Sequence, residues 1–170
     1  MVALFAAENY ELAVAGARLS LGPLPPSDAA ALGQAFAAMD PWASYAYPAD
    51  AIASYLAGTE IDGLRFLLRV DGEVAGALGL QTVWLRGPYI RFLAILPTFQ
   101  GRGLGTAILM WIEDEARKAE QRNLWVVASQ INTGAIRFYE HHGFKQAAQF
   151  DGLAYDDRIE ILMRKQLAGG

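Results

Sequence analysis

The sequence predicts a mixed α/β fold with one central sheet, mostly antiparallel, of about six to seven strands flanked by about four helices. Three observations lead to this prediction. The middle of the chain reads as consecutive strands joined by glycine turns, a long helix with a broad apolar face follows, and strands then alternate with helices. The 170 residues suit a single domain over residues 1–170, with its core over about 17–165.

The N-terminal part predicts one strand and two helices. Ala17 to Leu21 reads as a short strand, whereas the first dozen residues show no clear pattern. Ser27 is expected to cap a helix that runs to about Met39 and stops at Asp40-Pro41-Trp42. A second helix is expected over 48–56, since Pro48 suits a first turn and Gly58 follows the end.

The middle of the chain predicts an antiparallel meander. Leu64 to Val70 and Glu73 to Leu85 form a hairpin around Asp71-Gly72, and Gly87-Pro88 turns the chain into a strand from Tyr89 to Ile95.

The C-terminal half predicts alternating elements. A helix is expected from Leu104 to about Ala119, then a buried strand from Leu124 to Ser129. Asn132 should cap a helix that runs to about His142. Two final strands are expected near Lys145–Phe150 and Arg158–Met163.

Composition excludes several classes of function. Without cysteine there is no disulfide, thiol catalysis or thiolate metal site. A net charge of −4 provides no basic field for nucleic acid. No apolar stretch or leader predicts a membrane span or secretion, so a cytoplasmic location is expected. The two histidines, His141 and His142, are adjacent at a predicted helix end, and no third ligand is spaced to join them. A metal site is therefore not expected.

The segment that carries chemistry runs from Leu93 to Thr106. Glycines at 101, 103 and 105 permit unusual dihedral angles and close approach, and the helix start behind them suits an anion such as pyrophosphate, with Arg102 as an added cation. The density of glycines alone is equally consistent with an anion-binding loop and with an ordinary surface turn that binds no ligand. A P-loop lysine is missing, and Thr106 stands where a dinucleotide fingerprint needs its third glycine or alanine.

Two signatures in this half resemble a known family. The acyl-CoA-binding pattern Gln/Arg-x-x-Gly-x-Gly/Ala is met by Gln100, Gly103 and Gly105, after a strand end at 92–97. The segment Asn132-x-x-Ala135-x-x-Phe138-Tyr139-Glu140-x-x-Gly143-Phe144 matches the family's second signature. The chain therefore closely resembles the GCN5-related N-acetyltransferase (GNAT) family.

The resemblance implies acetyl-CoA as co-substrate and no metal. The backbone of residues 93–95 should contact the pantetheine arm of the co-substrate and present an amide to the thioester oxygen. The glycine loop over residues 101–106 should wrap the pyrophosphate. Asn132 should contact the pantetheine arm and also cap its helix. Tyr139 should lie near the sulfur and protonate the leaving thiolate as general acid. The implied cofactor-binding residues are Leu93, Ala94, Ile95, Gln100, Gly101, Arg102, Gly103, Leu104, Gly105, Thr106, Asn132 and Tyr139.

The general base and the acceptor are left open. Ribosomal-protein alanine acetyltransferases of the family carry a glutamate where this chain has Val127. Glu73, Asp40, Asp156 or a water chain could substitute for it. Aromatic residues that could line an acceptor pocket, although aromatics are more often core, are Trp42, Tyr45, Tyr47, Trp84 and Tyr155.

The resemblance favours direct transfer of the acetyl group to a primary amine of a small molecule, a protein N-terminus or a lysine. Two alternatives remain: an acyl-CoA-binding sensor without catalysis on the same fold, and a nucleotide-binding α/β domain of another class. The expected partner is an amine acceptor, with no nucleic acid and no membrane. A homodimer is left open, since sheet-edge pairing is common in the family.

Overall fold

The computed structural model describes residues 2–167. The elements in chain order are β1 (Tyr10–Val14), β2 (Ala17–Pro23), α1 (Pro26–Ala37), α2 (Ala49–Leu56), β3 (Gly63–Val70), β4 (Glu73–Trp84), β5 (Gly87–Ile95), a short 3-10 helix η1 (Pro97–Phe99), α3 (Leu104–Lys118), β6 (Asn123–Ser129), α4 (Thr133–His141), β7 (Lys145–Asp151) and β8 (Ile159–Gln166). The predicted strands and helices are present, with bounds shifted by a few residues.

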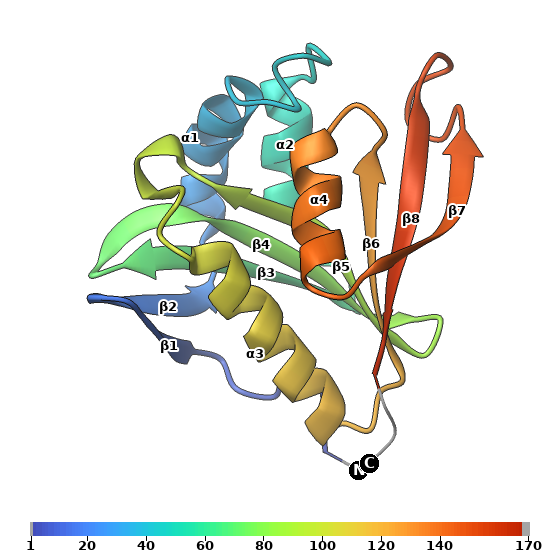
Figure 1. Cartoon of the computed structure of the whole chain (residues 1–170). Helices are drawn as coiled ribbons and strands as arrows, with labels where there is room; N and C mark the ends of the chain where they lie inside the picture. The colour runs from blue at the N-terminus through green and yellow to red at the C-terminus, as the bar shows by residue number, and fades with distance from the viewer. Residues whose placement is uncertain (1, 168–170) are drawn as a thin grey trace.

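The strands form a single eight-stranded sheet in the order β1-β2-β3-β4-β5-β6-β8-β7 (Figure 1). All neighbouring strands run antiparallel except β5 and β6, which are parallel. The mostly antiparallel central sheet is therefore confirmed, with one strand more than the six to seven expected.

The additional strand is β1, which pairs with β2 from Tyr10↔Leu21 to Val14↔Ala17. Its turn contains Gly16 with a φ of 71°. Tyr10, Leu12 and Val14 alternate toward the core, which is the signal of a half-buried strand. That signal covers only five residues, which is too short to stand out in the sequence.

The first helix corrects two expectations. α1 begins at Pro26 with Pro25 as its N-cap and no side-chain capping bond, so Ser27 lies inside the first turn and does not cap it. Proline at the first helical position already supplies the required φ, and its missing N–H leaves one donor fewer to satisfy at the start of the helix. The helix ends at Ala37, capped at Ala38, two residues before the expected Met39.

The helices cover both faces of the sheet (Figure 1). One buried cluster joins the sheet to α3 and α4, with Leu78, Ile108 and Tyr139 among its members. A second cluster joins the opposite face to α1 and α2 through Phe36, Ile52 and Ala94. The sheet is thus the middle layer of the protein, and each apolar face has its own cover.

The parallel neighbours β5 and β6 separate soon after they meet. They are paired only at Tyr89↔Trp125 and Ile90↔Val126, so the rest of β5 diverges from β6. On its other side, β5 carries an extra residue: Ile90 pairs with Leu80 and Phe92 with Gly79, which leaves Arg91 unpaired. A bulge of this kind bends a strand, and here it accompanies an opening through the sheet.

Candidate functional site

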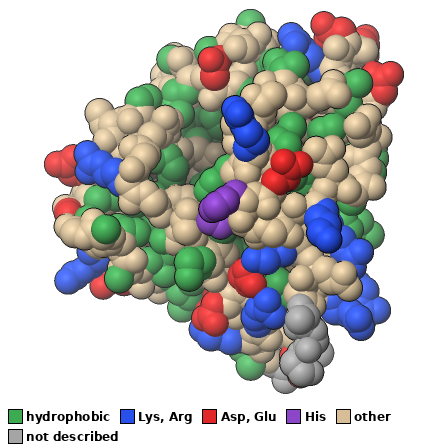
Figure 2. All heavy atoms as spheres, viewed as in Figure 1, with side chains coloured by type: hydrophobic (Ala, Val, Ile, Leu, Met, Phe, Trp, Pro, Cys, Tyr) green, Lys and Arg blue, Asp and Glu red, His purple; other side chains and the backbone are tan. Residues whose placement is uncertain are grey.

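A cleft of about 1110 Å³ occupies the opening between β5 and β6. One wall comes from β5 and the start of α3, and the other from β6, α4 and β8. At one end lie the loop after α1 and the loop between β7 and β8. Figure 2 shows a hollow on the face covered by α3 and α4, with the histidine pair beside it. The cleft therefore connects the two faces of the sheet.

Eleven of the twelve predicted cofactor-binding residues line this cleft, and they are Leu93, Ala94, Ile95, Gln100, Gly101, Gly103, Leu104, Gly105, Thr106, Asn132 and Tyr139.

Arg102 is the predicted residue that does not line the cleft. Its guanidinium lies over the ring of Phe99, with 5.2 Å between Cζ and the ring centroid. This contact holds the side chain at the edge of the loop, on the aromatic residue of η1. A contact between Arg102 and a pyrophosphate stays a prediction.

The glycine loop turns the chain directly into α3. Gly101 and Gly103 have φ values of 73° and 78°, in the left-handed region that side chains other than glycine rarely adopt. Gly103 is the N-cap of α3, and a Cβ at either glycine would meet open space. The loop and the first turn of α3 thus line the cleft, and the two glycines place no side chain there, as an anion site at a helix N-terminus requires.

The backbone of β5 presents alternate groups to the cleft. The N–H of Leu96 donates to the carbonyl of Ala75 on β4 at 2.8 Å, and the carbonyl of Ala94 also points to β4, close to Gly76. Because successive residues of a strand direct their polar groups to opposite sides, those of Leu93 and Ile95 face the opening. Two N–H groups therefore point toward the separated β6, whereas that of Ala94 is directed to the sheet.

Gln100 braces this arrangement. Its side-chain amide donates to the carbonyl of Ile95 at 2.9 Å, which also confirms that the polar groups of Ile95 face away from β4. The glutamine of the acyl-CoA pattern thus fixes the strand end relative to the glycine loop, and it occupies the carbonyl of Ile95, one of the two that face the opening.

The start of α3 packs on α4. A Cβ at Gly105 would lie 3.0 Å from Cζ of Phe138, so glycine permits the close contact between the two helices. The side chain of Leu104 is buried in the core. The hydroxyl of Thr106 and Nε2 of His142 are 3.1 Å apart. His142 is thus tied to the loop, and burial, followed by the neighbouring His141, lowers its pKa.

The second signature supplies one capping residue and one phenol. Oδ1 of Asn132 accepts from the N–H of Ala135 at 3.2 Å, so the expected helix cap is confirmed. Tyr139 is 6% exposed, and burial, with a smaller effect of Tyr89, raises its pKa well above the ordinary value of tyrosine. It remains a neutral proton donor at every physiological pH.

The opposite end of the cleft is aromatic. Trp42, Tyr45, Tyr47 and Tyr155 line it, and the ring of Tyr155 lies 5.9 Å from Tyr45 and 6.4 Å from Tyr47. Trp84 does not line it, because its ring packs on Tyr89 and Trp125 at the far end of β4. Sequence spacing alone could not separate this half-buried tryptophan from the aromatics of the cleft.

The cleft contains two acidic residues, one of which sequence analysis missed. Asp40 lines it as predicted, whereas Glu73 and Asp156 do not. Glu160 of β8 lines it as well and is only 9% exposed. The available signal was the single charge in the otherwise apolar run Ile159-Glu160-Ile161-Leu162. Val127 lines the cleft from β6 without a charged group, and Leu162 of β8 pairs with it.

The described residues offer neither a metal site nor a membrane span. No cluster of three or more histidine, cysteine, aspartate or glutamate residues within 2–167 could hold a metal ion. In the same range, no helix has the length and apolar character needed to cross a bilayer.

A family model described as the acetyltransferase (GNAT) family matches residues 31–144. The chain belongs to this GNAT family. The resemblance carried by the two signatures is thereby confirmed, and the matched range includes β5, the glycine loop, α3, β6 and α4.

The relatives of this GNAT protein cover part of its length. It is 31% identical over 110 residues to an uncharacterized N-acetyltransferase of Lactobacillus delbrueckii subsp. lactis, with 60% of this chain and 64% of that protein covered. It is 34% identical over 84 residues to the [ribosomal protein bS18]-alanine N-acetyltransferase of Escherichia coli (strain K12), with 49% and 56% covered. The chain thus spans less than two thirds of either curated relative.

Solved structures of GNAT proteins cover more of the chain. The ribosomal-protein-S18-alanine N-acetyltransferase from Escherichia coli matches with a TM-score of 0.66 and 26% identity, over 89% of this chain and 96% of that one. A ribosomal L7/L12 alpha-N-protein acetyltransferase, solved in complex with coenzyme A, matches with a TM-score of 0.70 and 17% identity, over 93% and 98%. The second likeness shows the fold alone.

Proposed function

We propose that this protein is an acetyl-CoA-dependent N-acetyltransferase that transfers the acetyl group directly to a primary amine of a small molecule, a protein N-terminus or a lysine. The observation that carries the proposal is the cleft through the sheet. It has a helix N-terminus and free strand amides at one end and an aromatic, acidic pocket at the other. Both reactants can therefore reach the same point from opposite faces.

The residues at the first end fit acetyl-CoA. A pyrophosphate needs N–H donors and close approach, and the amides at the start of α3 stand behind two glycines with open space in front. The ribosomal L7/L12 acetyltransferase of the same fold was solved with coenzyme A. When bound, acetyl-CoA supplies an acyl carbon activated as a thioester.

The residues at the centre of the cleft suit direct transfer. The N–H groups of Leu93 and Ile95 can donate to the negative charge that develops on the carbonyl oxygen, and they need no reorganisation because strand pairing already holds β5. Tyr139 can give its proton to the departing thiolate. Burial raises the pKa of Tyr139, and the same low-dielectric surroundings also raise the basicity of a thiolate formed there.

A non-catalytic acyl-CoA sensor would need only the end of the cleft formed by the N-terminus of α3 and the free amides of β5. The second end, with Glu160 and three tyrosines against the same opening, favours an acceptor and therefore turnover.

The first test measures binding and turnover in sequence. Thermal unfolding is recorded with acetyl-CoA, free CoA, NAD and ATP, because a ligand at 100 times its Kd stabilises the native state by about 2.7 kcal/mol. We expect stabilisation by the two CoA species only. Release of free thiol from acetyl-CoA is then followed with peptides bearing a free N-terminus and with small primary amines.

Each result decides one part of the proposal. Amine-dependent thiol release supports the enzyme. Stabilisation by CoA species without release for any amine supports the sensor instead, and stronger stabilisation by NAD or ATP would overturn the assignment of the donor site.

A further inference from the structure

We propose that Glu160 is the general base of this site: its carboxylate takes the proton from the ammonium group of the acceptor and so produces the neutral amine that attacks. This inference rests on the proposed acetyl transfer and goes beyond it by naming the residue that makes the acceptor reactive. It also defines the acceptor as a protonated primary amine.

The position of Glu160 on β8 aims its side chain at the cleft. Glu160 pairs directly with Ser129 of β6, so both side chains lie on the same face of the sheet. Its neighbours Ile159 and Ile161 belong to the cluster under α3 and α4, on the opposite face. Strand alternation therefore directs Glu160 away from that cluster, and it lines the cleft together with Ser129 and Tyr155.

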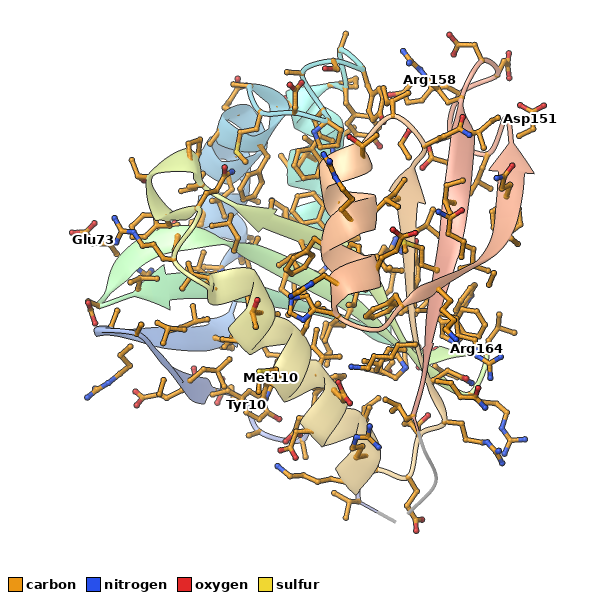
Figure 3. All side chains as sticks on the ribbon, in the orientation of Figure 1. Tyr10, Glu73, Met110, Asp151, Arg158 and Arg164 are labelled. Atoms are coloured by element: carbon orange, nitrogen blue, oxygen red, sulfur yellow. The ribbon has the colours of Figure 1, made fainter. Side chains whose placement is uncertain are left out.

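The groups that face Glu160 come from four elements. β6 contributes Ser129, β5 contributes the phenol of Tyr89, and the β7–β8 loop contributes Tyr155 and Arg158. On β7 the paired residue is Phe150, which carries no charge. Asp151 pairs with Ile159 and in Figure 3 points outward from the edge of the sheet. Arg158 is thus the single cation among these groups.

Buried polar atoms mark where the acceptor nitrogen would sit. The hydroxyl of Tyr45 is buried at the cleft and has no hydrogen-bond partner within the described part of the chain. The hydroxyl of Ser129 is buried there as well and interacts with the carboxylate of Glu160. Buried polar groups are usually paired, so an unpaired phenol in the same cleft as this Ser129–Glu160 pair points to a polar ligand. A primary ammonium offers three N–H donors, which Glu160 and Ser129 can accept together.

The other acids are less suited to the role. Oδ1 of Asp40 already accepts from the N–H and the hydroxyl of Ser44, at 3.2 Å and 2.5 Å. Glu73 begins β4 at a turn away from the cleft, and Asp156 is exposed in the β7–β8 loop. Glu160 is the acid that is both buried and on the cleft wall.

The proton balance is complete without another reactant. Glu160 takes one proton from the ammonium and passes it to solvent. The amine nitrogen then forms a bond to the thioester carbon as the carbon–sulfur bond breaks. The nitrogen loses its second proton to Glu160, Tyr139 gives its own proton to the thiolate, and the phenol is restored from the proton that Glu160 holds. The net products are the amide, the free thiol and one proton in solution.

The electrostatic surroundings support this assignment. Burial raises the pKa of Glu160, and the nearby Ser129 hydroxyl and Arg158 guanidinium oppose the shift. A carboxylate with a raised pKa is a stronger base than a solvated one, which brings it closer to the pKa that suits proton transfer near neutral pH.

The test compares Glu160→Gln and Glu160→Asp with wild type, with Asp156→Asn as the matched control in an exposed loop. We expect Glu160→Gln to lower kcat/KM for the best amine about 100-fold at pH 7. The loss should shrink toward pH 9, because the neutral fraction of a lysine-like amine rises about 100-fold between these values. Glu160→Asp should keep the rising limb of the pH profile at a lower rate, and Asp156→Asn should match wild type.

A second readout needs no turnover. Because the pKa of Glu160 is raised in the folded state, the native state binds more protons than the unfolded state between the ordinary value near 4.3 and the raised one. Wild type should lose stability as the pH rises through this window, whereas Glu160→Gln should not. Glu160→Gln should therefore match wild type near pH 4 and unfold at higher temperature at pH 7, while acetyl-CoA still stabilises it.

The outcomes separate this inference from the proposed function. Wild-type turnover with an unchanged rate and pH profile in Glu160→Gln would overturn the role of Glu160 alone. A binding-competent wild type that acetylates no amine would overturn both. Wild-type turnover together with the selective, pH-dependent loss in Glu160→Gln would establish the assignment.

Discussion

At position 139, a single phenol combines burial with access to the cleft. Tyr139 is packed against Phe138 and Phe144, with ring centroids 5.2 Å and 5.3 Å away, so its orientation is set by α4 and the turn that follows. Its raised pKa keeps it protonated throughout the physiological range. A general acid is useful only while it holds its proton, and this environment keeps the proton in place until a thiolate forms.

Tyr139→Phe should therefore separate catalysis from binding. The variant removes one hydroxyl and keeps the ring, so stability and stabilisation by acetyl-CoA should stay near wild type. We expect kcat to fall about 100-fold, the usual contribution of a positioned acid. Steady-state thiol release and thermal unfolding measure the two effects, and an unchanged kcat would contradict the role of the phenol.

Among the elements, the contact between α3 and α4 decides how the glycine loop is held. Gly105 of α3 faces the ring of Phe138 on α4, and the link between Thr106 and His142 lies one residue further on. The first turn of α3, which carries the amides of the proposed anion site, is thus located by its neighbour helix. Gly105 belongs to the acyl-CoA pattern. Its close contact with Phe138 is a structural reason for glycine at this position, in addition to any contact with a ligand.

Gly105→Ala should loosen this contact. The added Cβ would stand 3.0 Å from Cζ of Phe138, so the ring or the helix that carries it must move by a few tenths of an ångström. This should cost about 1–3 kcal/mol, less the roughly 1 kcal/mol by which alanine favours a helix over glycine. We expect lower stability and weaker binding of acetyl-CoA, measured by thermal unfolding and by calorimetric titration.

Two variants control this prediction. Phe138→Leu combined with Gly105→Ala should recover part of the affinity for acetyl-CoA, because the smaller side chain frees the space. Gly134→Ala in α4 meets nothing within 4 Å and should leave stability equal or slightly raised. A loss of stability in Gly134→Ala as large as that in Gly105→Ala would show that backbone effects, rather than the helix contact, are responsible.

Across the whole molecule, an ion pair joins the helix layer to β8, the strand between β6 and the edge strand β7. Nζ of Lys165 on β8 lies 2.5 Å from Oε2 of Glu113 on α3, and Arg117 donates to the other carboxylate oxygen at 2.7 Å. Burial works to raise the pKa of Glu113, but the hydrogen bonds from Lys165 and Arg117 outweigh it and hold the pKa below its usual value. This pair fixes α3 against the strand that carries Glu160.

Glu113→Gln should consequently reduce stability in a pH-dependent way. Because the folded pKa is depressed, the contribution of Glu113 is fully present above the unfolded value near 4.3 and is lost as the pH falls through the lower folded value. We expect a loss of about 1 kcal/mol at pH 7 that shrinks as the pH falls below the unfolded pKa, measured by urea unfolding. Asp114→Asn, which removes the exposed pair of Asp114 with Lys118, should change little over the same pH range.

Local patterns made much of the fold predictable. The hairpin at Asp71-Gly72, the cap at Asn132 and the broad apolar face of α3 depend on neighbouring residues, so the sequence alone indicated them. The same holds for the glycine loop and the GNAT signatures, which lie in continuous segments. Two expectations were wrong. Pro25, rather than Ser27, is the N-cap of α1, because proline at the first helical position competes with a serine cap. The strand β1 was not expected, because its alternation of apolar residues is only five residues long.

By itself, the sequence determined the family, the loop behind the proposed donor site and the phenol of Tyr139, because each is written in residues close together along the chain. Only the tertiary structure decided which acid faces the cleft and which aromatics surround it. Glu160, Ser129 and Tyr45 come from three distant segments, and they meet because β8 inserts beside β6 while β5 turns away. Strand order and alternation of side chains, rather than spacing along the chain, bring them into one cleft.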